Sequence, residues 1–182
     1  MDQEQSQKSR PWLAVGQEID ELLPRIDPDA FAAVVAATAD ASRRIFFSGQ
    51  GRSGLSAEMG AMRFMHIGRQ THFCGEATAP SVRKGDVMII VSGSGETPVS
   101  VSYGRIAKAE GATLVVITRM PQSTLAGIAD VVLPVPVVDS AQLGGNLFEV
   151  TSLILLDTLA MEHAKSLPDP HGTLKYNHTN MQ

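Results

Sequence analysis

The sequence has very little cysteine and no long hydrophobic segment. Its single cysteine, Cys74, excludes a framework of intramolecular disulfides and is typical of a reducing compartment. No basic start followed by an apolar run indicates a signal peptide, and the most apolar helical stretch, residues 147–161, is too short to span a bilayer. We therefore expect a cytoplasmic protein with no membrane partner.

The chain also lacks an excess of positive charge. The 15 Lys and Arg residues are outnumbered by 19 Asp and Glu residues, which gives a formal net charge of −4. Because nucleic-acid phosphates are bound by clustered Lys and Arg, this balance argues against a nucleic-acid partner. With 43% hydrophobic and 19% charged residues, the composition is instead that of a globular chain large enough to bury its own core.

Short apolar runs alternate with helical patterns along most of the chain. The runs 45–47, 71–74, 87–91, 113–117 and 131–135 predict strands, and residues 53–67, 97–110, 123–129 and 146–164 predict helices. Strands that are apolar throughout and separated by helices are typical of a parallel sheet covered on both faces. We predict a doubly wound α/β fold of three layers, α/β/α, with about five parallel strands in the flavodoxin-like order 2-1-3-4-5.

The two ends of the chain lie outside this alternation. Residues 1–10 are polar and are expected to be disordered, whereas residues 11–23 and 28–42 predict an N-terminal helical pair. This pair would either brace the domain or form an oligomer surface. The polar tail from Pro168 is expected to extend away from the domain. Residues 11–182 would then form a single domain that includes the helical pair and the tail.

Two glycine-rich loops follow the first and third predicted strands. They are Gly49-Gln50-Gly51-Arg52-Ser53-Gly54 and Ser92-Gly93-Ser94-Gly95-Glu96-Thr97. In a sheet of order 2-1-3-4-5 these loops lie side by side at the carboxyl ends of the strands, where open sheets bind ligands. Thr97 and Pro98 suit the N-cap and first position of a helix, so its dipole adds to the loop N–H and hydroxyl groups. The pair of loops therefore predicts a phosphate site.

The first loop also fits the dinucleotide-binding fingerprint. Gly49-x-Gly51-x-x-Gly54 follows a strand, opens a helix and has Glu76 about twenty residues further on. However, Arg52 and Ser53 put polar groups where the pyrophosphate turn usually has small apolar residues. The serine-rich second loop would also have no role in such a fold. A nicotinamide or flavin domain remains an alternative.

Taken together, these motifs resemble a sugar isomerase (SIS) domain and, more narrowly, the 6-phospho-3-hexuloisomerase family. The similarity also includes Met62-Arg63-Phe64-Met65-His66, Gly75-Glu76, Gly144-Gly145-Asn146-Leu147-Phe148-Glu149 and His178-Thr179-Asn180, and it covers the chain from about Pro11 to the end. The family tail usually reads Arg-His-Ala-Asn-Leu-Glu. Here it is Asn177-His178-Thr179-Asn180-Met181-Gln182, so an arginine and a terminal glutamate are absent.

The resemblance implies isomerisation of D-arabino-3-hexulose 6-phosphate to D-fructose 6-phosphate in the ribulose monophosphate pathway of formaldehyde fixation. It implies an enediolate mechanism without a metal or organic cofactor, a homotetramer, and pathway coupling to 3-hexulose-6-phosphate synthase. Glu149 would be the base, and His178 a proton shuttle or hydroxyl partner that the tail delivers to a neighbouring subunit. The implied substrate-binding residues are Gly51, Arg52, Ser53, Ser92, Ser94, Gly95, Glu96 and Thr97.

Several roles have more than one interpretation. Arg52 could contact the phosphate, hold the enediolate oxygen, or pair with Glu96 or Glu76. The five histidines show no ligand spacing with Cys74 or carboxylates, and no metal site is predicted. The stripe formed by Met59, Met62 and Met65 is most simply core packing.

Two other functions stay open at this point. One is a different aldose–ketose isomerase, acting for example on arabinose phosphate or sedoheptulose phosphate. The other is a catalytically silent SIS module that senses a sugar phosphate for regulation.

Overall fold

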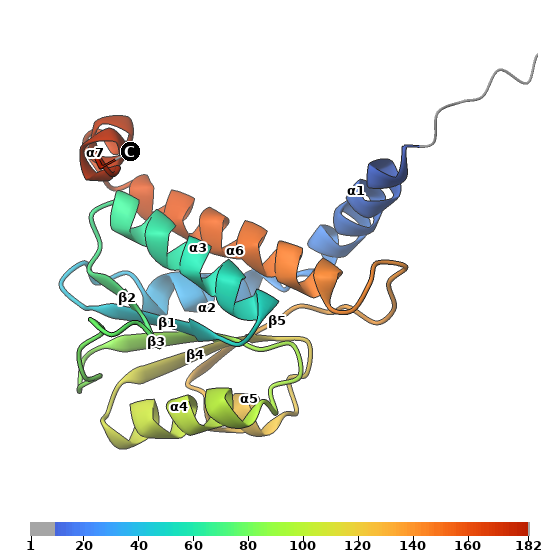
Figure 1. Ribbon diagram of the computed structural model, residues 1–182, viewed down its shortest axis with the longest axis horizontal. Helices are drawn as coiled ribbons and strands as arrows, with labels where there is room; N and C mark the ends of the chain where they lie inside the picture. The colour runs from blue at the N-terminus through green and yellow to red at the C-terminus, as the bar shows by residue number, and fades with distance from the viewer. Residues whose placement is uncertain (1–9, 182) are drawn as a thin grey trace, which may run out of the picture.

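The computed structural model describes residues 10–181 and shows a parallel sheet between two layers of helices (Figure 1). The elements are α1 (Pro11–Leu22), the 3-10 helix η1 (Leu23–Arg25), α2 (Pro28–Ala37), β1 (Ile45–Gly49), α3 (Arg52–His66), β2 (Thr71–Phe73), β3 (Val87–Val91), α4 (Pro98–Ala109), β4 (Thr113–Thr118), α5 (Thr124–Ile128), β5 (Val131–Pro134), α6 (Asn146–Ala164) and α7 (Pro170–Asn177). The strand order is β2-β1-β3-β4-β5, which confirms the predicted topology. The predicted N-terminal disorder falls almost wholly on residues 1–9, outside the described residues.

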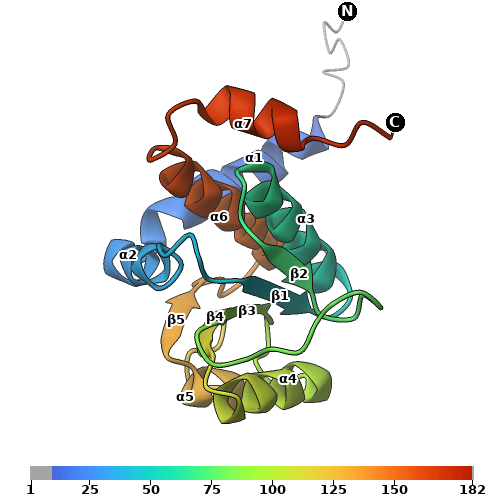
Figure 2. The same cartoon turned by 90° about the vertical axis from the view of Figure 1, so that its left-hand side faces the viewer.

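Alternate side chains of the central strands face opposite helix layers. Ile45 and Phe47 pack into a core shared with α2, α3 and α6, whereas Phe46 faces a second core shared with α4 and α5. Figure 2 shows the sheet lying between these two groups of helices. Since both faces are covered, every residue of β3 is buried, which explains why this strand is apolar without alternation.

Helix α2 is shorter than predicted, because it ends at Ala37 and not at Ser42. The Thr38 hydroxyl donates to the Val34 carbonyl at 2.8 Å, and it also lies 2.8 Å from His163 Nε2 on α6. Asp40 then closes a turn, accepting from the Ser42 backbone N–H at 2.9 Å. These side-chain bonds to the backbone compete with continuation of the helix.

The C-terminal tail does not extend away from the domain, and that prediction was wrong. Residues 170–177 form α7, which packs beside the C-terminal end of α3 (Figure 2). Asp169 caps the helix by accepting from the Gly172 N–H at 2.9 Å, and Pro170 occupies the first turn. The Asn177 side chain donates to the His66 carbonyl at 3.2 Å. The Asp-Pro pair was the available signal for this helix.

The methionine stripe on α3 is exposed, which corrects the prediction of core packing. Met59 and Met62 are 53% and 57% exposed, and Met65 is 37% exposed. The buried face of α3 carries small residues instead, since a Cβ at Gly60 would lie 2.8 Å from Leu156 Cδ1. Helices α3 and α6 approach too closely for methionine to lie between them.

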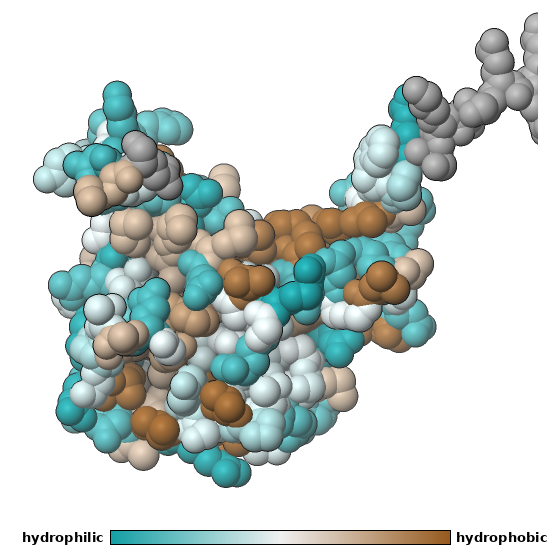
Figure 3. Space-filling model, in the orientation of Figure 1, coloured by the Kyte–Doolittle hydropathy of each residue, from teal (hydrophilic) through white to brown (hydrophobic). Residues whose placement is uncertain are grey.

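Helix α1 projects from the body, whereas α2 packs against the sheet and thus acts as a brace (Figure 1). On α1, Trp12 and Leu13 are 64% and 58% exposed. Figure 3 shows hydrophobic side chains gathered in the angle between α1 and α6. Within residues 10–181, no helix combines the length and the apolarity that crossing a membrane would require.

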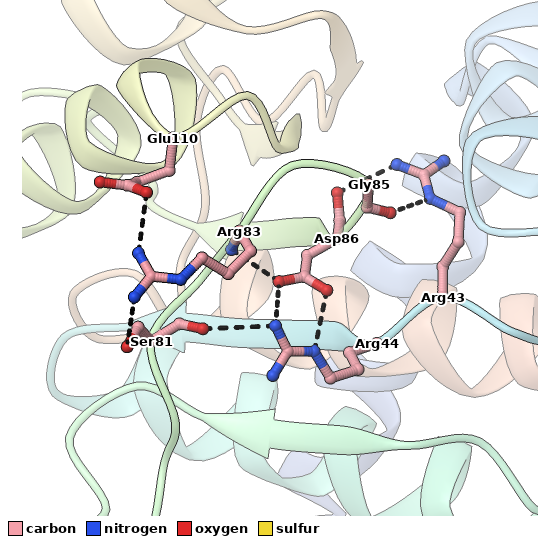
Figure 4. A network of polar contacts seen from close by, with 7 residues as sticks. All are labelled: Arg43, Arg44, Ser81, Arg83, Gly85, Asp86 and Glu110. Atoms are coloured by element: carbon pink, nitrogen blue, oxygen red, sulfur yellow. Dashed lines mark hydrogen bonds and ion pairs between the residues drawn. The ribbon is translucent and has the colours of Figure 1, made fainter.

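An ion-pair network holds together the amino ends of β1 and β3 (Figure 4). Arg44 precedes β1, and its Nη2 lies 2.6 Å from a carboxylate oxygen of Asp86, which precedes β3. That carboxylate also accepts from the Arg83 backbone N–H at 2.7 Å. Arg43 donates to the Asp86 carbonyl at 3.0 Å. The amino ends of these strands are thus occupied by structural contacts. The glycine-rich loops lie at the carboxyl ends of the strands, which form the carboxyl edge of the sheet.

Candidate active site

The two glycine-rich loops leave the sheet side by side, as predicted. Gly49 at the end of β1 and Val91 at the end of β3 are partners in the parallel ladder. Because the two strands end at the same level, the segments that follow them share the carboxyl edge of the sheet. Helix α3 begins after the first loop, α4 begins after the second loop, and α6 begins after the loop that follows β5.

The second loop, residues 92–97, folds into a compact turn before α4. Ser92 Oγ accepts from the Gly95 N–H, and Ser94 Oγ accepts from the Glu96 N–H, each at 3.2 Å. Gly95 has a φ of 63°, and a Cβ there would lie 2.0 Å from Ser123 Oγ, so only glycine fits. Thr97 is the N-cap of α4 but makes no side-chain cap bond. The turn therefore gathers hydroxyl groups at the N-terminus of a helix, where an anion is favoured.

Glu96 has a contact outside this turn. Its carboxylate accepts from the Thr124 backbone N–H at 2.6 Å, at the start of α5. Hydrogen bonds from Thr124 hold the pKa of Glu96 below its usual range. This hydrogen bond gives the carboxylate a structural role at the start of α5, and a substrate contact by Glu96 stays a prediction.

Arg52 and Glu149 form an ion pair at the same edge of the sheet. Arg52 is the first residue of α3, and Glu149 lies in the first turn of α6. The Arg52 guanidinium also donates to the Asn146 side-chain oxygen. The Glu149 side chain is only 15% exposed, against 62% for Arg52. Arg52 thus pairs with the predicted base, and not with Glu96 or Glu76 as one interpretation held.

A series of hydrogen bonds connects this ion pair to α1. Glu18 on α1 accepts hydrogen bonds from the loop 140–142, including one from the Gln142 amide at 2.9 Å. These bonds, led by the one from the Ser140 hydroxyl, hold the pKa of Glu18 below its usual range. Gln142 in turn accepts from the Asn146 amide, and Asn146 accepts from Arg52. The projecting helix therefore helps to place the Arg52 guanidinium that pairs with Glu149.

His178 lies far from this site within the same chain. Its ring stacks on that of His66, with centroids 5.1 Å apart and planes 9° apart. His66 is the last residue of α3, whereas Arg52 is the first, so the helix separates them by ~21 Å. Glu149 thus lies at the same end of the sheet as the serine-rich loop, whereas His178 does not.

One candidate residue was missed by the sequence analysis. Arg119 follows β4 at the same edge, and its backbone N–H donates to the Gly93 carbonyl at 3.3 Å. The available signal was a cation placed directly after the apolar strand Thr113–Thr118. Because ligands bind at the carboxyl ends of such strands, the residue following each strand is a candidate.

Comparison with known proteins agrees with this geometry. A family model described as the SIS domain matches residues 39–162. The chain is 35% identical over 153 residues to a 3-hexulose-6-phosphate isomerase of Mycobacterium gastri, covering 80% of this chain and 76% of that one. It is 33% identical over 150 residues to a protein of the same name from Bacillus subtilis (strain 168), covering 78% and 81%.

A solved structure shows the same arrangement. The protein MJ1247 of Methanococcus jannaschii, for which a 3-hexulose-6-phosphate isomerase function has been inferred, has a TM-score of 0.84 and 30% identity, covering 94% of this chain and 99% of that chain. The glycine motif 49–54, which also fits a dinucleotide fingerprint, lies inside the span matched by the family model. The chain belongs to the SIS-domain family.

Proposed function

We propose that this protein isomerises D-arabino-3-hexulose 6-phosphate to D-fructose 6-phosphate. The observation that carries the proposal is the Arg52–Glu149 pair, placed at the carboxyl edge of the sheet together with the serine-rich turn 92–97. Relatives that are 33% and 35% identical and bear the name 3-hexulose-6-phosphate isomerase support the choice of substrate. Residues 11–182 would act as one SIS domain.

In this proposal the serine-rich turn binds the phosphate group. Ser92, Ser94 and Thr97 contribute hydroxyl and backbone donors, and the positive end of α4 adds a favourable field. Gly51 and Ser53, at the start of α3, supply a second helix N-terminus from the neighbouring loop. A phosphate held in this way fixes the position of the carbon chain relative to Glu149, which replaces a search through many orientations by one productive geometry.

Glu149 is the proposed base. It takes the proton from C2, beside the C3 ketone, and the electron pair forms the C2–C3 double bond of an enediol(ate). The proton returns to C3. C2 becomes the carbonyl carbon as its hydroxyl oxygen loses a proton, and the former ketone oxygen on C3 gains a proton. C2 is oxidised and C3 reduced within one molecule, so atoms and electrons balance without an external oxidant. The Arg52 cation stabilises the negative oxygen that develops in the intermediate.

The proposed active form is a tetramer in which a neighbouring chain completes the site. Leu55, Met59 and Met62 form an exposed apolar stripe on α3, and α1 carries exposed Trp12 and Leu13. Apolar surface of this kind is typical of contact between subunits. In such an assembly, His178 of the partner subunit would act as the proton shuttle or hydroxyl partner.

A coupled assay that reports fructose 6-phosphate tests the proposal. The purified chain should convert 3-hexulose 6-phosphate, made in place by a 3-hexulose-6-phosphate synthase, without added metal or cofactor. If the protein instead turns over arabinose 5-phosphate or sedoheptulose phosphate in preference to 3-hexulose 6-phosphate, that sugar phosphate is the substrate. Tight binding of fructose 6-phosphate with no turnover of any of these sugars would instead identify a sensing module.

A further inference from the structure

Arg119 is the feature of the carboxyl edge that the proposed function leaves unexplained. Its backbone N–H is bonded to the Gly93 carbonyl, so the residue is fastened to the serine-rich loop. Its side-chain Nε is fully buried and has no hydrogen-bond partner among residues 10–181. Arg69 also has a buried Nε without a partner, but its Nη2 donates to the Asp40 carbonyl at 2.6 Å. The guanidiniums of five further arginines in these residues donate to protein oxygens; these are Arg43, Arg44, Arg52, Arg63 and Arg83.

A buried donor without a partner is costly, because the group loses its hydrogen bonds to water. Such a cost is not needed for the fold, since an apolar residue could fill the same space. It is offset if a ligand supplies the missing acceptors. The unpaired Nε therefore indicates an oxygen-bearing ligand beside Arg119.

A cavity of about 200 Å³ lies beside this side chain. Its lining includes Arg119, Asp139, Ser140, Gly145 and Phe148, so it brings a cation, a carboxylate and a hydroxyl around one space. At ~30 Å³ per water molecule, it has room for about seven waters or for a short polyhydroxy chain.

The position of the cavity connects the two parts of the proposed site. Two residues of its lining adjoin the serine-rich loop, because a Cβ on Gly93 would lie 3.2 Å from Phe148 Cδ1 and 3.4 Å from Arg119 Nε. A third lining residue adjoins the proposed base, because Glu149 Oε1 lies 3.3 Å from the point where a Cβ on Gly145 would stand. The cavity thus lies where the carbon chain of a substrate would lie between its phosphate and the base.

We propose that Arg119 is a substrate-binding residue that holds oxygen atoms of the open sugar chain, while the serine-rich turn holds the phosphate. The inference rests on the proposed function and deepens it. A guanidinium presents several N–H donors in a planar fork and suits adjacent carbonyl and hydroxyl oxygens. The Asp139 carboxylate, which also lines the cavity, offers an acceptor to the remaining hydroxyl groups.

Calorimetric binding to wild type and Arg119→Gln tests the assignment, with fructose 6-phosphate and inorganic phosphate as separate probes. Arg119→Gln should weaken fructose 6-phosphate binding by about tenfold or more and leave phosphate binding within about twofold, because only the sugar oxygens lose a charged donor. Arg119→Lys should recover part of the affinity. Arg105→Gln, a change of an exposed arginine on α4, is the matched control and should bind both probes as wild type does.

Two results would overturn the assignment. Unchanged affinity of Arg119→Gln for fructose 6-phosphate, with circular dichroism showing an intact fold, would remove Arg119 from the site. An equal loss for both probes would make Arg119 a phosphate ligand and not a sugar ligand. The test reads binding alone, so a protein that binds fructose 6-phosphate but turns over no hexulose would fail the proposed function without deciding against Arg119.

Discussion

At the scale of single residues, the chemistry depends on where one carboxylate and one turn are placed. Glu149 is mostly buried and is held by the Arg52 guanidinium, which is a suitable arrangement for a base that must approach a carbon acid in a fixed direction. The serine-rich turn depends on Gly95, whose positive φ no residue with a side chain would adopt there without displacing Ser123.

Changing Glu149 to Gln should lower kcat by at least about a hundredfold, because an amide cannot accept the proton from carbon. KM should change little, since the serine-rich turn is intact. Steady-state kinetics on 3-hexulose 6-phosphate measure both constants. Glu58→Gln, which alters an exposed carboxylate on α3, serves as the control. A near-normal kcat of Glu149→Gln would show that Glu149 is not the base.

Changing Ser94 to Ala should raise KM by about tenfold or more, because the loop loses one hydroxyl donor to a charged phosphate. The effect on kcat should be smaller. Ser102→Ala, on the exposed face of α4, is the matched control. An unchanged KM, and unchanged affinity for inorganic phosphate, would remove this serine from the phosphate site.

At the scale of elements, the site is held by contacts between segments that are far apart in the sequence. Helix α1 reaches the loop 140–142 through Glu18, and that loop reaches Arg52 through Asn146. The first turns of α3 and α6 also meet directly, since the Ser56 hydroxyl donates to the Glu149 carbonyl at 3.0 Å. A change in α1 is therefore expected to affect catalysis although α1 contributes no group to the chemistry.

Changing Glu18 to Gln should lower kcat by about tenfold with little change in KM, because an amide N–H2 replaces one of the two acceptor oxygens of the loop 140–142 and Arg52 is positioned less well. Asp20→Asn, a neighbouring exposed carboxylate on α1, should behave as wild type. Steady-state kinetics should show a lower kcat with a nearly unchanged KM, which distinguishes an effect on the positioning of Arg52 from an effect on substrate binding. A parallel loss of folding stability and activity would indicate that Glu18 only supports the fold.

Two histidines at the ends of helices should make folding stability depend on pH. Burial lowers the pKa of His66, helped by the nearby charges of His178 and Arg63, and burial also lowers the pKa of His163. A histidine whose pKa is lower in the folded state binds a proton more readily when unfolded. Above about pH 6.5 neither state is protonated, so stability is unaffected; below it, stability falls until the lowered pKa is passed.

The urea midpoint should therefore decrease between pH 7.5 and pH 5.5, a window above the titration of the carboxylates. His163→Gln should reduce this dependence on pH, whereas His171→Gln, at an exposed position of α7, should leave it as in wild type. If His163→Gln keeps the full dependence, His163 is not its source.

At the scale of the whole molecule, the proposed site is incomplete in one chain. Glu149 lies at the N-terminal end of α6 near the carboxyl edge of the sheet, whereas His178 stacks on His66 at the far end of α3. A single chain cannot bring the two together without undoing α7. The exposed apolar stripe on α3 and the projecting α1 favour an assembly that supplies the second group from another copy.

Mixing two inactive variants should test this arrangement. Glu149→Gln and His178→Ala are each expected to have low activity, and joint unfolding and refolding should restore part of it. Some sites would then combine an intact Glu149 with an intact His178 of the partner subunit. Separate refolding of each variant is the control. No recovery despite mixed oligomers would mean that the two residues do not share a site.

Much of this protein followed from its sequence alone. The uninterrupted apolar runs, such as residues 87–91, separated by helical patterns, predicted strands buried on both faces of a parallel sheet. The flavodoxin-like strand order typical of such a fold then predicted that the two loops are neighbours. Glycine and serine in these loops predicted an anion site, because their geometry and donors act locally.

Only the tertiary structure decided which distant groups meet. The exposure of the methionines on α3 depends on how closely α6 approaches Gly60, and the docking of α7 depends on the end of α3 being uncovered. The pairing of Arg52 with Glu149, and the unpaired Nε of Arg119, are equally invisible in the sequence. Local patterns determine strands, turns and caps, whereas contacts across many residues depend on the packing of whole elements.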